Sequence, residues 1–380
     1  MLCRGVKVLI VGAGIGGLCT AIALRRWGID CLVLEREPEL RPVGAGLCLW
    51  HNAMQAMLSL GLAEQLHPLA AQFDHQENRT WDGHVLESQS FVALAQEVGA
   101  QAITLQRSDL QRVLLANLEP ATLRLGARVV SYSATNERIE VQLSDGGSET
   151  GDCLVGADGI HSAIRAQLSG LEEPVRYAGY TCCRGLVAYR PEWFAKGWFV
   201  QGIGEGARFG VTHSGNDQVY WWTTFNAPQD SADAEGGRKA ELLRRYAGWA
   251  PPIVDILAAT RESAILRNDI VDREPTDDWG EGPVTLLGDA AHPMTPNMAQ
   301  GACQAIEDAV VLANRLAEVD VGGVASALRR YEQARQERTA TIVRQSWLIG
   351  ARGQGLLDPE TALRAFKLAD RDSLLRYVPR

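Results

Sequence analysis

The sequence predicts an α/β fold in which a mainly parallel sheet carries an inserted antiparallel sheet and is followed by a helical C-terminal segment. Three observations predict it. The chain opens with a strand, a glycine-rich loop, a helix and a second strand. Residues 172–270 contain short strands separated by glycine-rich turns. A second combination of strand, tight loop and helix lies far along the chain, at residues 286–301.

Composition limits the possible functions before any motif is considered. The 380 residues suffice for two domains, and 46% hydrophobic with 22% charged residues is ordinary for a globular enzyme. A net charge of −9 argues against a nucleic-acid partner, which requires a basic face. No apolar run reaches the roughly 20 residues of a membrane span, and no signal peptide is recognisable, so we expect a cytoplasmic location. The eight cysteines have no metal-ligand spacing, which predicts buried thiols and no metal site.

The first loop has the pattern of a dinucleotide site. Residues 6–11 form a continuous apolar run, as in a parallel strand buried on both faces. Gly12, Gly14 and Gly17 follow in G-x-G-x-x-G spacing and lead into a helix predicted over residues 15–27. Gly12 allows the tight turn, Gly14 allows a pyrophosphate to approach the backbone, and Gly17 allows close packing of helix on strand. The free N–H groups at the helix N-terminus would bind the phosphates.

The second strand, predicted over residues 31–34, ends at Glu35. A carboxylate in this place accepts hydrogen bonds from an adenosine ribose and disfavours a 2′-phosphate. The motif therefore predicts FAD or NAD and does not choose between them.

The middle of the chain alternates between two patterns. A helix is predicted over residues 52–60, and another near residues 110–118, with Ser108 as its N-cap and Arg107 just ahead of it. Asp145-Gly146-Gly147 predicts a hairpin, followed by a single strand that ends at Val155. Residues 172–270 then predict an antiparallel sheet, which is a natural side for a substrate pocket.

The second loop places a carboxylate, Asp289, at the end of a buried strand. Two prolines, an asparagine and Gln300-Gly301 follow, and a helix is predicted from about Ala302. A tight loop of this kind would present backbone N–H groups and a helix N-terminus to a ligand.

Three motifs in this order carry a resemblance to a known family. They are the first loop with Glu35, "GADGIHSAIR", and "GDAAHPMTPNMAQGACQAIEDA", and the terminal "LRRYEQARQERTATIVRQSW" is also similar. The combination resembles the single-component FAD-dependent aromatic hydroxylases of the para-hydroxybenzoate hydroxylase family. That resemblance implies a Rossmann-type FAD-binding domain of the GR2-like kind, FAD as cofactor, and NADH or NADPH as a transient reductant.

The resemblance also implies site residues. Asp289 would accept hydrogen bonds from the ribitol, the loop that follows would pass along the isoalloxazine, and Arg107 and Asp158 would contact the cofactor. The full set of implied cofactor-binding residues is Gly12, Ala13, Gly14, Gly16, Gly17, Glu35, Arg36, Gly46, Arg107, Val129, Asp158, Gly288, Asp289, Pro296, Met298, Ala299, Gln300 and Gly301. His292 would orient backbone in the same loop.

One departure from the family stands at Ala299, where relatives commonly have glycine. If the position requires a positive φ, alanine there costs roughly 1 kcal/mol. We expect the loop to tolerate this.

The implied reaction is hydroxylation of an aromatic or N-heteroaromatic compound with NAD(P)H and O₂ through a flavin C4a-hydroperoxide. Arg208 and Tyr220 are predicted on adjacent strands, with a spacing similar to that of substrate-binding residues in flavin urate hydroxylases. Arg184 and His213 are further pocket candidates. Since no run of basic residues occurs near this sheet, the sequence argues weakly against a strongly anionic substrate.

The domain prediction is discontinuous, and the chain is expected to be a monomer or homodimer. Residues 1–72, 100–171 and 271–320 would form the FAD-binding domain, residues 73–99 and 172–270 the substrate domain, and residues 321–380 the C-terminal helices. The alternatives are a flavin epoxidase or urate-type hydroxylase of the same fold and, more distantly, a non-catalytic flavin-binding protein. An NAD-dependent dehydrogenase would have no use for the Asp289 loop, and a flavin halogenase would need motifs that are absent.

Overall fold

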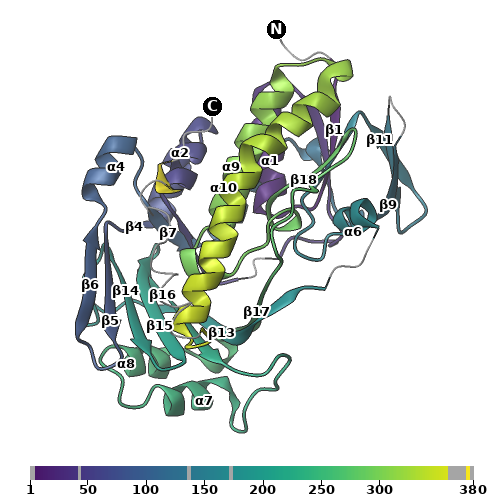
Figure 1. Ribbon diagram of the computed structural model, residues 1–380. Coiled ribbons are helices and arrows are strands. Elements are labelled where there is room, and N and C mark those ends of the chain that lie inside the picture. Colours follow the sequence, from purple (N-terminus) through teal and green to yellow (C-terminus); the bar gives the residue numbers. More distant parts are fainter. Residues whose placement is uncertain (1–4, 42–43, 135–137, 171–173, 358–373, 377–380) are drawn as a thin grey trace.

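The computed structural model describes residues 5–41, 44–134, 138–170, 174–357 and 374–376. Two large sheets lie at opposite ends of the molecule, and a long C-terminal helix, α10, runs between them (Figure 1).

The first sheet is five-stranded and parallel, with strand order β18-β12-β1-β2-β8. Its strands are β1 (Lys7–Val11), β2 (Asp30–Leu34), β8 (Leu123–Arg124), β12 (Cys153–Gly156) and β18 (Val284–Leu286). The central strands are buried on both faces, as their apolar runs predict. Helices α1 (Ile15–Arg26) and α9 (Gly301–Ala317) pack against each other beside it. The predicted α/β class is confirmed.

The second sheet is seven-stranded, with order β17-β13-β16-β15-β14-β5-β6. All neighbouring strands are antiparallel except β5 and β14. The strands are β5 (His75–Thr80), β6 (Val85–Ser90), β13 (Arg176–Ala188), β14 (Trp198–Gly204), β15 (Ala207–Ser214), β16 (Gln218–Asn226) and β17 (Leu266–Asp272). Helices α7 (Gly237–Arg245) and α8 (Ile253–Ala259) contribute Leu242, Ile256 and Leu257 to a core on one face, which we call the outer face. The opposite, inner face lies toward the parallel sheet (Figure 1), and its Phe199 and Trp222 pack into the large core that also contains β1.

Two small sheets contain the remaining strands of the described residues. One contains β9 (Val129–Ala134), β10 (Ile139–Leu143) and β11 (Ser148–Gly151), and the other β3 (Gly46–Leu49), β4 (Ala71–Gln72) and β7 (Ile103–Gln106). The hairpin predicted at Asp145 joins β10 to β11, but the single strand predicted after it is wrong. It breaks at Asp152, whose side chain and backbone both bond to Lys7, so β11 and β12 enter different sheets.

The remaining helices are α2 (His51–Ser59), α3 (Ala63–Leu66), α4 (Val92–Val98), α5 (Arg107–Ala116), α6 (Ala163–Ser169) and α10 (Val324–Gly353). Short 3₁₀ turns are η1 (His67–Leu69), η2 (Pro120–Thr122), η3 (Glu262–Ala264), η4 (Gly288–Ala290), η5 (Pro296–Met298) and η6 (Val321–Gly323). The predicted Ser108 N-cap is wrong, because α5 begins at Arg107 and Gln106 occupies the cap position without a side-chain bond.

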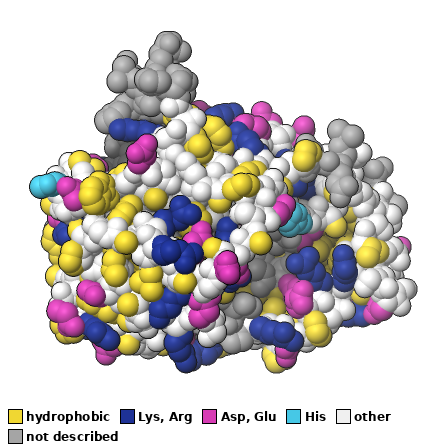
Figure 2. Space-filling view, turned by 90° about the horizontal axis from the view of Figure 1, so that it is seen from below, with side chains coloured by type: hydrophobic (Ala, Val, Ile, Leu, Met, Phe, Trp, Pro, Cys, Tyr) yellow, Lys and Arg dark blue, Asp and Glu magenta, His cyan; other side chains and the backbone are white. Residues whose placement is uncertain are grey.

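The thiols are buried, as the composition predicts. Seven cysteines from Cys19 to Cys303 are buried and free in the described chain. Basic and acidic side chains are interspersed over the face shown in Figure 2. Among the described residues, no helix combines the length and apolar character of a membrane span.

Candidate cofactor and substrate site

The glycines of the first loop have the separate tasks that the sequence predicts. Gly12 has φ of 103°, and a Cβ on it would lie 2.5 Å from the carbonyl oxygen of Ala157. A Cβ on Gly17 would lie 2.0 Å from the carbonyl oxygen of Gly12, so helix and turn touch there. Gly14 has open space within 4 Å, and no side chain caps the α1 N-terminus. The loop therefore leaves room and free N–H donors for a phosphate group.

Glu35 lies beside this loop and is only 9% exposed. Its carboxylate accepts hydrogen bonds from the backbone N–H of Ala13 at 2.7 Å and of Glu37 at 2.9 Å. These bonds fix the carboxylate at the end of β2, where the predicted ribose contact would be made. Arg36 is exposed and pairs with Glu37. Val129 is buried at the start of β9, close to Ala127, whose backbone N–H donates to the Glu35 carbonyl oxygen.

The second loop leaves the same sheet edge as the first. Strand β18 is separated from β1 by one strand, so their ends lie about 10 Å apart. Asp289 follows β18 in η4, and its side chain is accessible to solvent although many protein atoms lie around the carboxylate. These atoms displace water and raise the pKa of the Asp289 carboxyl, and the charges of His292 and Arg107 offset part of that rise. Arg107 is brought there from the start of α5, so residues remote in sequence converge as predicted.

The middle motif joins the two loops. Asp158 accepts hydrogen bonds from the Ser162 hydroxyl at 2.5 Å and from the backbone N–H of Ala163 at 2.8 Å, so it stabilises the start of α6. Arg165, buried on α6, donates to the carbonyl oxygens of Ala290 and Ala291. Asp158 thus has a structural task, and its predicted cofactor contact stays a prediction.

The loop ahead of α9 has the strained residue that the sequence suggested. Ala299 has φ of 50° and ψ of 38°, which is the left-handed region. Helix α9 starts two residues later, at Gly301, and no side chain caps this N-terminus. The side chain of Gln300 bonds to Asn52, while Met298 packs against α10 and Pro296 is exposed. The uncapped backbone N–H groups of this loop are therefore free to bind a ligand, in the manner of the first loop.

A buried ionic network, which sequence reasoning missed, supports the second loop from behind. Asp308 on α9 accepts hydrogen bonds from the Gly288 N–H at 3.0 Å and from Arg335 Nε at 2.6 Å, and its carboxylate lies 2.6 Å from His292 Nε2. Arg335 on α10 also bonds to Glu307. Burial acts to raise the pKa of the Asp308 carboxyl, but His292 and Arg335 hold it at about 2. Two adjacent acids in an otherwise apolar helical pattern were the available signal.

The inner face of the seven-stranded sheet carries both predicted substrate residues. The registers β15–β16 and β13–β16 place Arg208, Tyr220 and Arg184 on this face. Arg208 is buried and donates to Asn297 in η5, a link that the sequence did not predict. Tyr220 packs against β3, where a Cβ on Gly46 would lie 2.2 Å from its ring. Burial raises the pKa of Tyr220, and the adjacent Arg184 offsets part of that rise.

His213 lies on the outer face and so does not join this group. Side chains alternate between the two faces along β15, and His213 is an odd number of residues from Arg208.

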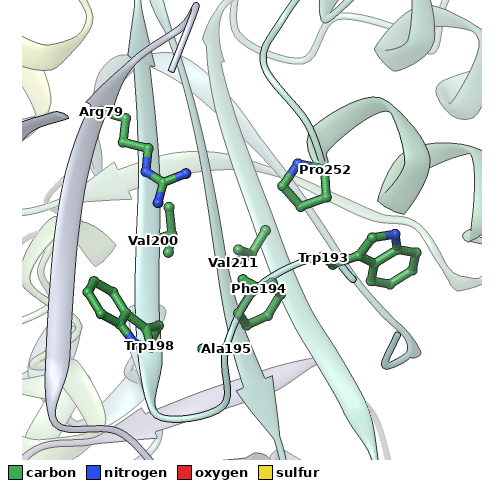
Figure 3. A pocket seen from close by; sticks show the side chains of 8 residues that line it. All are labelled: Arg79, Trp193, Phe194, Ala195, Trp198, Val200, Val211 and Pro252. Carbon is green, nitrogen blue, oxygen red and sulfur yellow. The ribbon is translucent and has the colours of Figure 1, made fainter. Parts of the chain in front are cut away.

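The outer face also has a pocket of about 230 Å³ (Figure 3). It is lined by Arg79, Trp193, Phe194, Ala195, Trp198, Val200, Val211 and Pro252. The sheet separates this pocket from Arg208 on the inner face.

Together the two uncapped helix N-termini, the open space at Gly14 and the accessible Asp289 carboxylate define a site for an extended dinucleotide. The residues present fit FAD. The model of the family described as "FAD binding domain" matches residues 5–346, and the chain belongs to this family.

Named relatives agree with that assignment. The aurachin C monooxygenase/isomerase of Stigmatella aurantiaca is 43% identical over 92% of this chain and 90% of its own length. The FAD-dependent urate hydroxylase of Klebsiella pneumoniae is 34% identical over 89% of this chain and 88% of its own. The crystal structure of Klebsiella pneumoniae HpxO complexed with FAD and uric acid superposes with a TM-score of 0.89, at 30% identity over 99% of this chain and 94% of that chain. The predicted FAD cofactor and monooxygenase class are confirmed.

Proposed function

We propose that this FAD-dependent monooxygenase inserts one oxygen atom of O₂ into a ring C–H bond of an aromatic or N-heteroaromatic compound. NADH or NADPH supplies the two electrons. The balanced reaction takes the aromatic compound, O₂, NAD(P)H and a proton to the hydroxylated product, water and NAD(P)⁺. The observation that carries the proposal is the convergence of Asp289 and the α9 N-terminus with the Gly12 loop at one sheet edge.

Bound FAD supplies the oxygen-activating redox chemistry, and the chain's residues supply binding, orientation and shielding from water. The uncapped N–H groups of α9 lie at the predicted flavin end, where their partial positive charge favours a reduced, anionic ring. The Asp289 carboxylate would bind the ribitol hydroxyls. Tyr220 and Arg208 face the same side from the inner sheet face and would orient the substrate ring.

The inner face also excludes water. Trp50, Phe73 and Phe199 form edge and tilted ring contacts with centroids 4.9–6.4 Å apart, and Phe199 contacts Trp222 at 4.8 Å. An apolar surface of this kind limits solvent access, which favours oxygen transfer over release of H₂O₂.

Urate is the first compound to test, because a urate hydroxylase is 34% identical and Arg208 and Tyr220 share one face of the sheet. Quinolones are the second, since the 43% identical relative is named for aurachin C. The domain division, the monomer or homodimer state and the cytoplasmic location remain predictions, and part of the C-terminal segment, residues 358–373 and 377–380, lies outside the described residues.

The test is a panel of urate, quinolones, phenols and other purines offered to the purified yellow protein. NADH and NADPH consumption is scored against H₂O₂ release for each compound. We expect at least one compound to stimulate NAD(P)H consumption with little H₂O₂. A protein that binds FAD but shows no compound-stimulated consumption would support the non-catalytic alternative instead.

A further inference from the structure

The pocket of about 230 Å³ on the outer face of the seven-stranded sheet has no part in the proposed reaction (Figure 3). Val200 on β14 lies opposite Val211 on β15 and opposite Glu77 on β5, so these three side chains share the outer face. Arg79, two residues after Glu77, lies on the same face. The residues proposed to orient the substrate lie on the inner face, so the sheet separates them from a ligand in this pocket.

Three aromatic side chains, Trp193, Phe194 and Trp198, form walls of the pocket. The Trp198 ring stacks on His75, with centroids 4.9 Å apart and an interplanar angle of 19°. Tyr189 contacts the Phe194 ring edge-on at 5.8 Å, and its hydroxyl donates to the Phe194 carbonyl oxygen at 2.7 Å. Trp193 is itself buried. These contacts hold the rings in place before a ligand binds, so ordering them on binding costs little entropy.

Arg79 supplies a charged donor group to these apolar walls. It is the only charged residue among the described residues that line the pocket, and Figure 3 shows its guanidinium extending toward Val200. Its Nε donates to the carboxylate of Glu77, which is buried. Within the described part of the chain, Glu77 is the only side chain that bonds to Arg79. The Nη donors are therefore available to an oxygen atom of a ligand.

The positive charge of Arg79 is already balanced by Glu77. An anionic ligand would be repelled by the Glu77 carboxylate, and a cationic ligand by the guanidinium. Lys196, which follows the pocket residue Ala195 in the sequence, is also paired, with Asp217 at 3.1 Å. An uncharged ligand with an acceptor oxygen meets neither repulsion and still gains a hydrogen bond.

The volume of the pocket limits the size of the ligand. A cavity of about 150 Å³ holds benzene, and sites for drug-sized molecules begin at roughly 300 Å³. A pocket of about 230 Å³ therefore fits one ring or two fused rings. Ala195, which lines the pocket, is exposed, so such a compound can enter from solvent.

We infer that the outer-face pocket is a second small-molecule site, which binds an uncharged planar compound of one or two rings with a carbonyl oxygen. The ring would pack among Trp193, Phe194 and Trp198, and the oxygen would accept a hydrogen bond from Arg79. The inference does not depend on the proposed function, because no residue of this pocket belongs to the FAD loops or to the inner face.

The test is a calorimetric titration of the oxidised, FAD-containing protein with four bicyclic probes. Oxindole is uncharged and has a carbonyl oxygen, indole lacks that oxygen, indole-2-carboxylate is an anion, and N-methylquinolinium is a cation. The flavin absorbance is recorded in parallel, because a probe bound beside the flavin would change it. We expect oxindole to show a binding event that leaves the flavin spectrum unchanged, with a dissociation constant below about 1 mM. Indole should bind at this site roughly fivefold or more weakly, because it cannot accept the hydrogen bond from Arg79.

Two variants at exposed alanines test the location of the site. Ala195→Phe would fill the pocket from its exposed side and should weaken oxindole binding about tenfold or more. Ala247→Phe is the matched control, because Ala247 is also exposed and does not line the pocket, and it should keep the full affinity.

A third variant, Glu77→Gln, tests the charge balance. Glutamine can still accept a hydrogen bond from Arg79, but the counter-charge is lost, so indole-2-carboxylate should bind about tenfold more tightly than to the unmodified protein. All three variants should keep their FAD, because none of them lies in a cofactor loop.

If oxindole does not bind, or binds equally to Ala195→Phe and Ala247→Phe, the site is overturned. If the anion or the cation binds more tightly than oxindole at the site that Ala195→Phe blocks, the ligand class is overturned. If Glu77→Gln leaves the affinity for indole-2-carboxylate unchanged, the charge-balance argument is overturned. None of these results bears on the proposed function, which is tested by NAD(P)H consumption.

Discussion

Replacing Ala299 by glycine should stabilise the protein. Ala299 has φ of 50° and ψ of 38°, where a Cβ approaches its own backbone and costs about 1–2 kcal/mol. Glycine removes that cost but loses about 0.4–1 kcal/mol through the freer unfolded chain. The Ala299 methyl is only partly buried in the core, so its loss offsets a few tenths of a kcal/mol more. The expected net gain is about 0.5 kcal/mol.

The matched control is Ala302→Gly. Ala302 lies in the first turn of α9, where glycine costs about 0.5–1 kcal/mol. Urea unfolding of the two variants and the unmodified protein should therefore give shifts of opposite sign, about 1–1.5 kcal/mol apart. FAD content should be unchanged in Ala299→Gly. If Ala299→Gly is no more stable than Ala302→Gly, strain at this loop is not what the geometry suggests.

Three further results are expected. Gly17→Ala should lower the melting temperature of the apoprotein, because the added Cβ would clash with the backbone of Gly12. Gly14→Ala should leave the melting temperature unchanged and weaken FAD binding, because the space around Gly14 is open. Equal destabilisation by the two variants would contradict their separate tasks. Arg335→Met should cost about 3–5 kcal/mol in urea unfolding by leaving buried carboxylates unpaired, while the more exposed Arg330→Met should cost little. The pKa of Asp308 is depressed to about 2, so the stabilisation that its charge provides is present above about pH 4 and lost as pH falls toward 2. The free energy of unfolding should therefore decrease over this pH range, and Asp308→Asn should make that decrease smaller.

Local pattern predicted the parts of the fold that depend on nearby residues. The apolar run, the three glycines and Glu35 define β1, α1 and β2 within one or two residues of where they occur. The positive φ at Ala299 was also predictable, because a family position held by glycine implies a special backbone conformation.

Long-range contacts explain what the sequence did not reveal. The break between β11 and β12 follows from the hydrogen bonds between Asp152 and Lys7, which are 145 residues apart in the sequence. The inner-face arginines are separated in sequence by whole strands, so no charge run announced them. His213 and Arg208 are near neighbours in sequence, yet strand alternation places them on opposite faces.

The central claim is that two remote loops bind opposite halves of one FAD. The most direct test is to measure the dissociation constants of FAD and of ADP, which contains only the adenosine diphosphate half of FAD. The measurements compare Asp289→Ala, Glu35→Gln and a control at an exposed position, Asp278→Ala. We predict that Asp289→Ala weakens FAD binding by tenfold or more and leaves ADP unchanged, that Glu35→Gln weakens both, and that Asp278→Ala changes neither. Equal weakening of ADP and FAD by Asp289→Ala, or no effect on FAD, would contradict the account.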